Sequence, residues 1–224
     1  MMRNKVIVFD LEDTLYKEVD FLKSGYRAVA DYLTQTYGIV DVYQKMWNYY
    51  QSKEKDVFQR VLDENQLMID KTDLIDIYRF HKPQLQFDKD VRYVLEQLHD
   101  KFPLALITDG RGRTKRNIIE ALGVSDYIGW SDIYISDEVG HLKTEPYSFF
   151  KIMEKFPTCH YVYVGDNLQK DFVVPNQLGW DSICLLDDGQ HIHEQDFNLE
   201  EIYLPKHKIS KLSELLELIL LVVR

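Results

Sequence analysis

The chain has 224 residues, of which 45% are hydrophobic and 29% are charged, and its formal net charge at pH 7 is −10. This composition indicates a folded globular protein with one sizeable core and room for a second small domain. The negative charge argues against a nucleic-acid binder or a protein of anionic membrane surfaces, because both need clustered positive charge.

The first apolar run predicts a buried strand. Residues 6–9 are four consecutive β-prone apolar residues, a pattern typical of a strand covered on both faces. The run is too short for a secretory signal. Two cysteines, Cys159 and Cys184, lack metal-ligand spacing and suit a reducing compartment. We therefore expect a cytoplasmic protein.

Residues 17–82 have a helical pattern throughout. Apolar residues recur at three- and four-residue steps from Phe21 to Tyr37, and further helical patches cover residues 42–50, 57–67 and 74–80. Residues 71–73 offer capping side chains for the last of these helices, and Pro83 ends the region.

After Pro83 the pattern alternates between helices and strands. Expected helices cover residues 88–98, 114–122 and 147–154 and a segment before Gly179, and expected strands cover residues 104–107, 133–135, 161–164 and 182–186. Strands separated by helices indicate a parallel sheet. We predict an α/β fold in which residues 1–16 and 83–224 form a Rossmann-like sheet with helices on both faces. Residues 17–82 form an inserted all-helical domain. The apolar residues 215–223, interrupted by Glu217, are too few to span a bilayer and predict a last core-packing helix.

Polar residues terminate several of the expected strands. The candidates are Asp10, Glu12, Asp13, Thr108, Asp109, Asp166 and Asp171, with Lys143 between two strands. In a right-handed parallel sheet these strand ends meet at one edge, where ligands bind. Several carboxylates there would be costly to desolvate without a cation or hydrogen-bond donors. The pattern predicts a metal site, a nucleophile, or both.

These motifs resemble those of the haloacid dehalogenase superfamily of phosphohydrolases. Residues 9–16 (FDLEDTLY) resemble its first motif, Thr108 the second, Lys143 the third, and residues 165–171 (GDNLQKD) the fourth. The match spans nearly the whole chain in the right order. The resemblance implies a capped, phosphatase-like subgroup in which the helical residues 17–82 close over the site.

The resemblance also implies a role for each matched residue. Asp10 attacks phosphorus and forms an aspartyl-phosphate, Thr108 binds a phosphoryl oxygen, and Lys143 pairs with Asp10. Asp10, the backbone carbonyl of Glu12, and Asp166 hold Mg²⁺, with Asp171 as a direct or water-mediated support. We expect a magnesium-dependent phosphatase for a small phosphorylated metabolite.

Glu12 departs from the family pattern, which has aspartate as general acid and base at this position. The carboxyl chemistry is kept, but the side chain is one methylene longer, and a misplacement of about 1 Å can cost roughly 100-fold in rate. Three interpretations stay open: a working acid with shifted geometry, a slow hydrolase, or a degenerate enzyme. The alternatives to a phosphatase are therefore a catalytically impaired phosphate-binding or regulatory module, and a phosphomutase.

The segment after Thr108 is a second departure, because asparagine commonly stands where this chain has Asp109. Asp109 either adds negative charge near the phosphate or faces away. The basic cluster at residues 111–116 either holds a second anionic group of the substrate or forms a solvated helix flank. Asp109, Gly110 and Arg111 are the substrate-binding candidates, with Arg111 expected nearest the pocket. His191 and His193, with Glu194 and Asp196, resemble a metal cluster but fit an exposed loop better.

Overall fold

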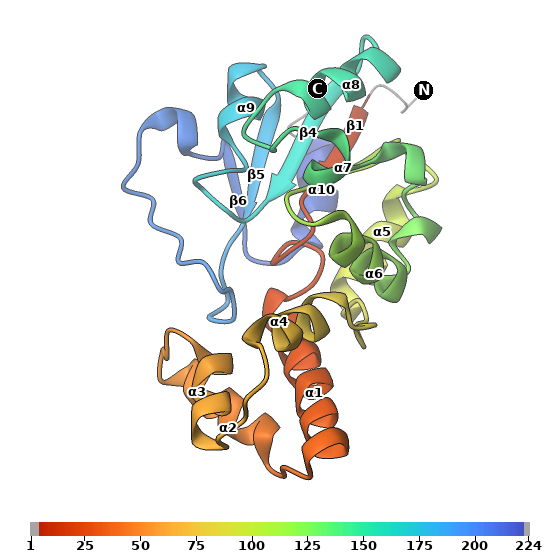
Figure 1. Cartoon of the computed structure of the whole chain (residues 1–224). Helices are drawn as coiled ribbons and strands as arrows, with labels where there is room; N and C mark the ends of the chain where they lie inside the picture. The colour runs from red at the N-terminus through yellow and green to blue at the C-terminus, as the bar shows by residue number, and fades with distance from the viewer. Residues whose placement is uncertain (1–4, 222–224) are drawn as a thin grey trace. The chain divides into compact units, whose positions relative to one another are not determined.

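The computed structural model describes residues 5–221 of the chain, which is drawn in Figure 1. The chain divides into two compact units. The first contains the residues up to Glu18 and those from Gln86 onward, and the second is the contiguous segment Val19–Leu85. The second unit thus begins and ends slightly later than the expected segment 17–82.

The first unit is built on a six-stranded sheet with the order β3-β2-β1-β4-β5-β6, in which every neighbouring pair is parallel. The strands are β1 Lys5–Phe9, β2 Leu104–Thr108, β3 Ile133–Ile135, β4 His160–Gly165, β5 Asp181–Leu185 and β6 His207–Ile209. Phe9 lies opposite Leu106 of β2 and Val164 of β4. The first strand of the chain is therefore central in the sheet, which explains its uninterrupted apolar run.

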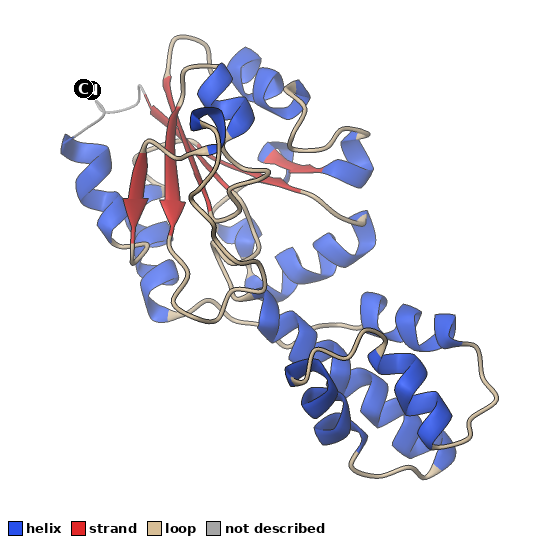
Figure 2. Ribbon diagram, turned by 90° about the vertical axis from the view of Figure 1, so that its left-hand side faces the viewer, coloured by secondary structure: helices blue, strands red, loops and turns tan. Residues whose placement is uncertain are grey.

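Helices cover both faces of this sheet (Figure 2). They are α5 Lys89–Leu98, α6 Gly112–Leu122, α7 Ser136–Val139, α8 Tyr147–Lys155, α9 Val173–Gln177 and α10 Glu214–Leu221. Phe149 of α8 and Val174 of α9 pack in one core cluster with the buried Val6 and Val8 of β1. The predicted Rossmann-like α/β fold is confirmed.

Local capping sets several helix starts and ends. Asp88 is the N-cap of α5, because its carboxylate accepts a hydrogen bond from the Val91 backbone N–H at 2.8 Å. The cap of α4 is Asp70, one residue before the expected segment 71–73, because its carboxylate accepts from the Thr72 N–H at 2.8 Å. The prediction of a helix to residue 67 is wrong, since α3 ends at Glu64.

The second unit contains the four helices α1 Glu18–Tyr37, α2 Val42–Gln51, α3 Val57–Glu64 and α4 Lys71–Phe80. Its own small core is formed by buried residues that include Leu33, Met46 and Leu74. Gly25 of α1 lies against the Tyr78 ring, because a Cβ at this position would come within 2.3 Å of a ring carbon. The unit is all-helical, as the sequence predicts.

The C-terminal helix α10 ends at Leu221, and the rest of the expected segment 215–223 lies outside the described residues. Within residues 5–221, no helix has the length and apolar character needed to cross a membrane.

Candidate active site

A small pocket of about 100 Å³ lies at the carboxyl ends of β1, β2 and β4. Its lining residues are Asp10, Glu12, Asp13, Glu18, Asp109, Lys115, Lys143, Asp166, Asn167, Lys170 and His193. All of them belong to the first unit. The sheet thus gathers most of the predicted polar strand-end residues at one edge, as parallel topology requires.

Lys143 is the buried cation of this pocket. Its Nζ lies 2.9 Å from Asp10 Oδ1 and 2.6 Å from Asp171 Oδ1, and the residue is only 5% exposed. Burial by itself would lower the pKa of Lys143, but the Asp10 and Asp171 carboxylates raise it well above its ordinary value. The ammonium group therefore stays charged beside Asp10.

Asp10 is also buried, and burial raises its pKa well above the ordinary value. Lys143 lowers the pKa of this carboxyl, while the carboxylates of Asp171 and Glu12 raise it further. Lys143 therefore favours the ionised form of Asp10, which is the form that an attacking carboxylate requires.

Asp171 organises the loop that follows β4. Its Oδ2 accepts hydrogen bonds from the backbone N–H groups of Asp166 at 3.0 Å and Asn167 at 2.7 Å, and its Oδ1 contacts Lys143. A Cβ at Gly165 would come within 2.5 Å of Asp171 Oδ2, so the approach of this carboxylate requires a glycine. Asp171 is thus held by donors of the protein itself.

Three groups of side chains among the described residues could hold a metal ion, and the two candidate ligand groups at this pocket overlap at Asp166. Carboxylate oxygens of Asp10, Asp166 and Asp171 lie within 4.8 Å of one another, and a similar group consists of Asp13, Asp166 and His191. Burial raises the pKa of Asp166, and Asp171 adds to the rise while His191 opposes it. Buried carboxylates with raised pKa values fit a divalent cation, and oxygen ligands are those that Mg²⁺ prefers.

Glu12 turns its longer side chain toward the neighbouring strand and helix. Its Oε2 accepts a hydrogen bond from the Thr108 hydroxyl at 3.0 Å, and its Oε1 accepts one from the Tyr16 hydroxyl at 3.1 Å. Oε1 also forms an ion pair with Lys115 Nζ. Burial would raise the pKa of Glu12, but the Lys115 ammonium, as a neighbouring charge and a donor, lowers it below its ordinary value.

The basic cluster contributes Lys115 to this pocket, whereas Arg111 lies elsewhere. Arg111 is exposed just before α6 and lines a separate open depression of about 820 Å³ with Asp109 and Gly110. Lys115 is 8% exposed. It continues the buried stripe of Ile118, Ile119 and Leu122 at helical spacing, a signal in the sequence that distinguishes it from the other basic residues.

Asp109 and Gly110 shape the loops around the pocket. Asp109 Oδ1 accepts a hydrogen bond from the Lys143 backbone N–H at 2.8 Å. Asp109 therefore anchors the segment that carries the catalytic lysine candidate. The Gly110 N–H donates to Ser136 Oγ at 2.9 Å.

Three residues around the pocket were not expected there. The His191 imidazole is fully buried, with Nδ1 3.5 Å from Asp166 Oδ2, so the prediction of an exposed loop is wrong for this side chain. His193 lines the pocket near Glu18. Burial, followed by the charges of Glu12 and Asp13, raises the pKa of Glu18 to about 7. These placements depend on contacts between distant parts of the chain, and no local sequence pattern predicts them.

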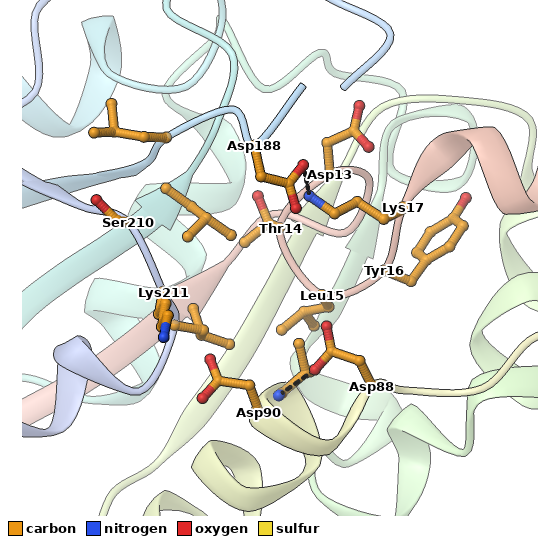
Figure 3. Close-up of a pocket in the computed structure, with 14 residues that line it drawn as sticks. Asp13, Thr14, Leu15, Tyr16, Lys17, Asp88, Asp90, Asp188, Ser210 and Lys211 are labelled. Atoms are coloured by element: carbon orange, nitrogen blue, oxygen red, sulfur yellow. Dashed lines mark hydrogen bonds and ion pairs between the residues drawn. The ribbon is translucent and has the colours of Figure 1, made fainter. Parts of the chain in front are cut away.

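A second pocket of about 340 Å³ lies beside residues 13–17 (Figure 3). In the close-up, Lys17 is paired with Asp188 at 2.9 Å. Asp13 lines both pockets, but Asp10 and Glu12 line only the smaller one. Asp13 also holds the local chain, because its Oδ1 accepts from the Glu18 N–H at 2.9 Å at the start of α1.

Comparison with known proteins agrees with the fold. The family model of haloacid dehalogenase-like hydrolases matches residues 7–184. The chain therefore belongs to the haloacid dehalogenase-like (HAD) hydrolase family. No curated protein matches the sequence.

Similar solved structures include several enzymes of this family. A 2-haloacid dehalogenase from Pseudomonas syringae pv. Tomato DC3000 is 22% identical, with 98% of each chain covered and a TM-score of 0.64. The HAD-hydrolase YfnB from Bacillus subtilis, bound to magnesium, is 19% identical over 97% of this chain and 99% of that one, with a TM-score of 0.67. A HAD phosphatase from Thermococcus onnurineus is 21% identical over 96% and 97%, with a TM-score of 0.59. These likenesses establish the fold.

Proposed function

We propose that the protein is a magnesium-dependent phosphatase that hydrolyses a small phosphorylated metabolite through an aspartyl-phosphate. The observation that carries the proposal is the buried contact of Lys143 with Asp10, which follows β1. Thr108 at the end of β2 and Asp166 after β4 stand at the same edge of the sheet. This arrangement supplies an attacking carboxylate and a fixed positive charge for an anionic substrate. A second carboxylate in the same pocket, Glu12, favours phosphate chemistry over dehalogenation, since a departing halide needs no proton.

In the first half of the reaction, an Asp10 oxygen forms a bond to phosphorus while the bond from phosphorus to the leaving oxygen breaks, and the leaving oxygen takes a proton from the Glu12 carboxyl group. Lys143 offsets charge on the phosphoryl group, and the Thr108 hydroxyl turns from Glu12 to donate to one of the phosphoryl oxygens. Asp10, the backbone carbonyl of Glu12, and Asp166 would hold Mg²⁺, which when bound supplies further positive charge. Asp171 supports this set indirectly by holding Lys143 and the loop of Asp166.

In the second half, water attacks phosphorus and the bond to Asp10 breaks. The lowered pKa of Glu12 favours its ionised form, which is the form that accepts a proton from the attacking water. We further propose that the helical unit Val19–Leu85 acts as a cap that excludes bulk water and selects the metabolite.

The first test is phosphate release from a panel of phosphorylated metabolites, with Mg²⁺ or with a chelator. We expect metal-dependent release by the wild-type protein and a loss of at least about 1,000-fold in Asp10→Asn, because the amide is not a nucleophile. Asp31→Asn, which changes an exposed carboxylate of α1, serves as the control with unchanged activity. Full activity of Asp10→Asn, or halide release from 2-haloacids without any phosphate release, would overturn the proposal.

A second candidate function is a phosphate-binding module without turnover. It is favoured by one observation, the engagement of the Glu12 carboxylate by Lys115, Thr108 and Tyr16, because a carboxylate held in these contacts is less available as an acid and base. Calorimetry with inorganic phosphate distinguishes the two functions. Tight phosphate binding without hydrolysis of any panel member, together with turnover in Glu12→Asp, would support the binding module.

A further inference from the structure

Lys115 is a buried ammonium group at the edge of the catalytic pocket. It comes from the first turns of α6, and its side chain is 10% exposed. A buried cation is costly to desolvate and is retained where a partner compensates its charge. That partner is the Glu12 carboxylate, with which Lys115 Nζ forms an ion pair.

The backbone provides a path for this lysine. A Cβ at Gly110 would come within 2.4 Å of Lys115 Cε, and Gly110 has a φ of +147°, a conformation that side chains disfavour. The glycine after Asp109 therefore leaves the space through which the alkyl chain of Lys115 reaches the pocket. The position of the ammonium group is thus fixed both by its ion pair and by packing along its stem.

The Glu12 carboxylate receives donors from three directions. Thr108 of β2 and Tyr16 of the loop after β1 donate hydroxyl hydrogen bonds, and Lys115 of α6 supplies the charged contact. Glutamate has one more rotatable bond than aspartate, so its carboxylate needs more restraint to occupy a single position. The contacts with Lys115, Thr108 and Tyr16 supply that restraint, and Lys115 alone among the three bears a charge.

We infer that Lys115 is a positioning residue that acts through Glu12. It holds the carboxylate of the longer glutamate beside Thr108, in the pocket that Asp10 also lines, where the proton transfers of hydrolysis take place. The inference rests on the proposed phosphatase function. It assigns Glu12 and Lys115 as one unit, so that removing either member has the same consequence for turnover.

A double-mutant cycle tests this assignment. Glu12→Gln, Lys115→Met and the double variant are compared with wild type in kcat and KM, on the best alkyl phosphate substrate of the panel with Mg²⁺. We expect Lys115→Met to lower kcat by about 100-fold, as for a misplaced reacting group, while KM changes less than about 3-fold. We also expect the double variant to be no slower than Glu12→Gln alone, because residues that act as a unit are non-additive.

Controls separate positioning from a general loss of structure. Lys151→Met removes an exposed lysine of α8 and should leave kcat unchanged. Lys115→Gln keeps a donor of similar length and should recover part of the lost rate. If Lys115→Met does not fold, Gly110→Ala replaces it, since its Cβ displaces the lysine stem while both charged groups remain.

Two results would overturn the inference in an active enzyme. One is a double variant in which the two losses multiply, and the other is a rise in KM at constant kcat, which would make Lys115 a substrate-binding group. If the wild type hydrolyses no substrate, the proposed function fails instead. Urea unfolding of wild type, the two single variants and the double variant then tests the pairing. Additive changes in the free energy of unfolding would contradict the unit, and non-additive changes would support it.

Discussion

Glu18 shows how the pocket affects single residues. Its pKa is raised from the ordinary 4.5 to about 7, first by burial and then by the charges of Glu12 and Asp13. Between these two values the folded protein binds more protons at Glu18 than the unfolded chain does. The contribution of the Glu18 carboxyl to the free energy of unfolding is therefore fully present below about pH 4.5 and is lost as the pH rises through 7.

We predict that Glu18→Gln changes the pH dependence of stability. The amide does not ionise, so the variant should gain about 1 kcal/mol relative to wild type at pH 8 and nothing at pH 4, after allowance for the partial exposure of the side chain. Urea unfolding with a chelator, at pH 4, 6 and 8, measures the difference. Glu96→Gln, at an exposed position of α5, is the control. Parallel curves for Glu18→Gln and wild type would contradict the prediction.

The candidate site could be predicted where residues follow buried strands. Asp10, Thr108 and Asp166 each stand at or just after a strand of apolar residues, and the parallel sheet brings them together. In the basic cluster, Arg111 was expected nearest the pocket, but Lys115 is the member of the cluster that lines it. The position along α6 distinguishes the two residues. Lys115 falls on the buried face of the helix, where a lysine must reach a partner.

At the scale of elements, the loop after β4 depends on one glycine. We predict that Gly165→Ala lowers the free energy of unfolding by about 1–3 kcal/mol, the usual cost of overpacking, because its Cβ would lie 2.5 Å from Asp171 Oδ2. The displaced carboxylate should also weaken magnesium binding at least several-fold. Urea unfolding and magnesium titration calorimetry measure the two effects.

Gly179→Ala is the matched control for that experiment. Its φ of +75° carries the backbone cost of about 1 kcal/mol, but no atom of the described residues lies within 4 Å of the added Cβ. This variant should lose stability without losing magnesium affinity. Equal magnesium affinities for Gly165→Ala and wild type would show that Asp171 does not organise the metal loop.

Elements rich in apolar residues were predictable, and two elements with few apolar residues were not. The expected strand at residues 133–135 is β3, and β1, β2, β4 and β5 were located to within about one residue. The strand β6, residues His207–Ile209, and the helix α7, residues Ser136–Val139, escaped prediction. Each contains a single apolar residue and shows no period, and β6 is defined by pairing with β5 rather than by its own sequence.

At the scale of the whole molecule, the candidate active-site pocket shares the excess of acidic over basic residues that the chain has. The pocket is lined by the six carboxyl groups of Asp10, Glu12, Asp13, Glu18, Asp109 and Asp166, against the three lysines Lys115, Lys143 and Lys170. The like charges of these carboxylates repel one another, and a bound divalent cation should reduce this repulsion. Metal binding is therefore expected to contribute to global stability.

We predict that Mg²⁺ raises the free energy of unfolding by about 2.7 kcal/mol at a concentration 100 times its Kd. Asp166→Asn should lose most of this gain, because it removes a carboxylate common to both candidate ligand groups. Asp100→Asn, at an exposed position, should keep the gain in full. Urea unfolding at increasing Mg²⁺ concentrations checks both expectations, and an equal gain in Asp166→Asn would exclude this metal site.

The order of strands in the sheet also has a consequence for biosynthesis. The proposed nucleophile Asp10 follows β1, but Phe9 of this strand pairs with Leu106 and Val164, which the ribosome makes much later. The helical segment Val19–Leu85 is contiguous and has a core of its own, so its local contacts are complete long before β1 has neighbours. During this stage of synthesis the apolar strand β1 has no neighbouring strand to pair with. A nascent chain released before β4 would carry Asp10 without a complete sheet to hold it, so the proposed reacting groups can assemble only after β4 has been made.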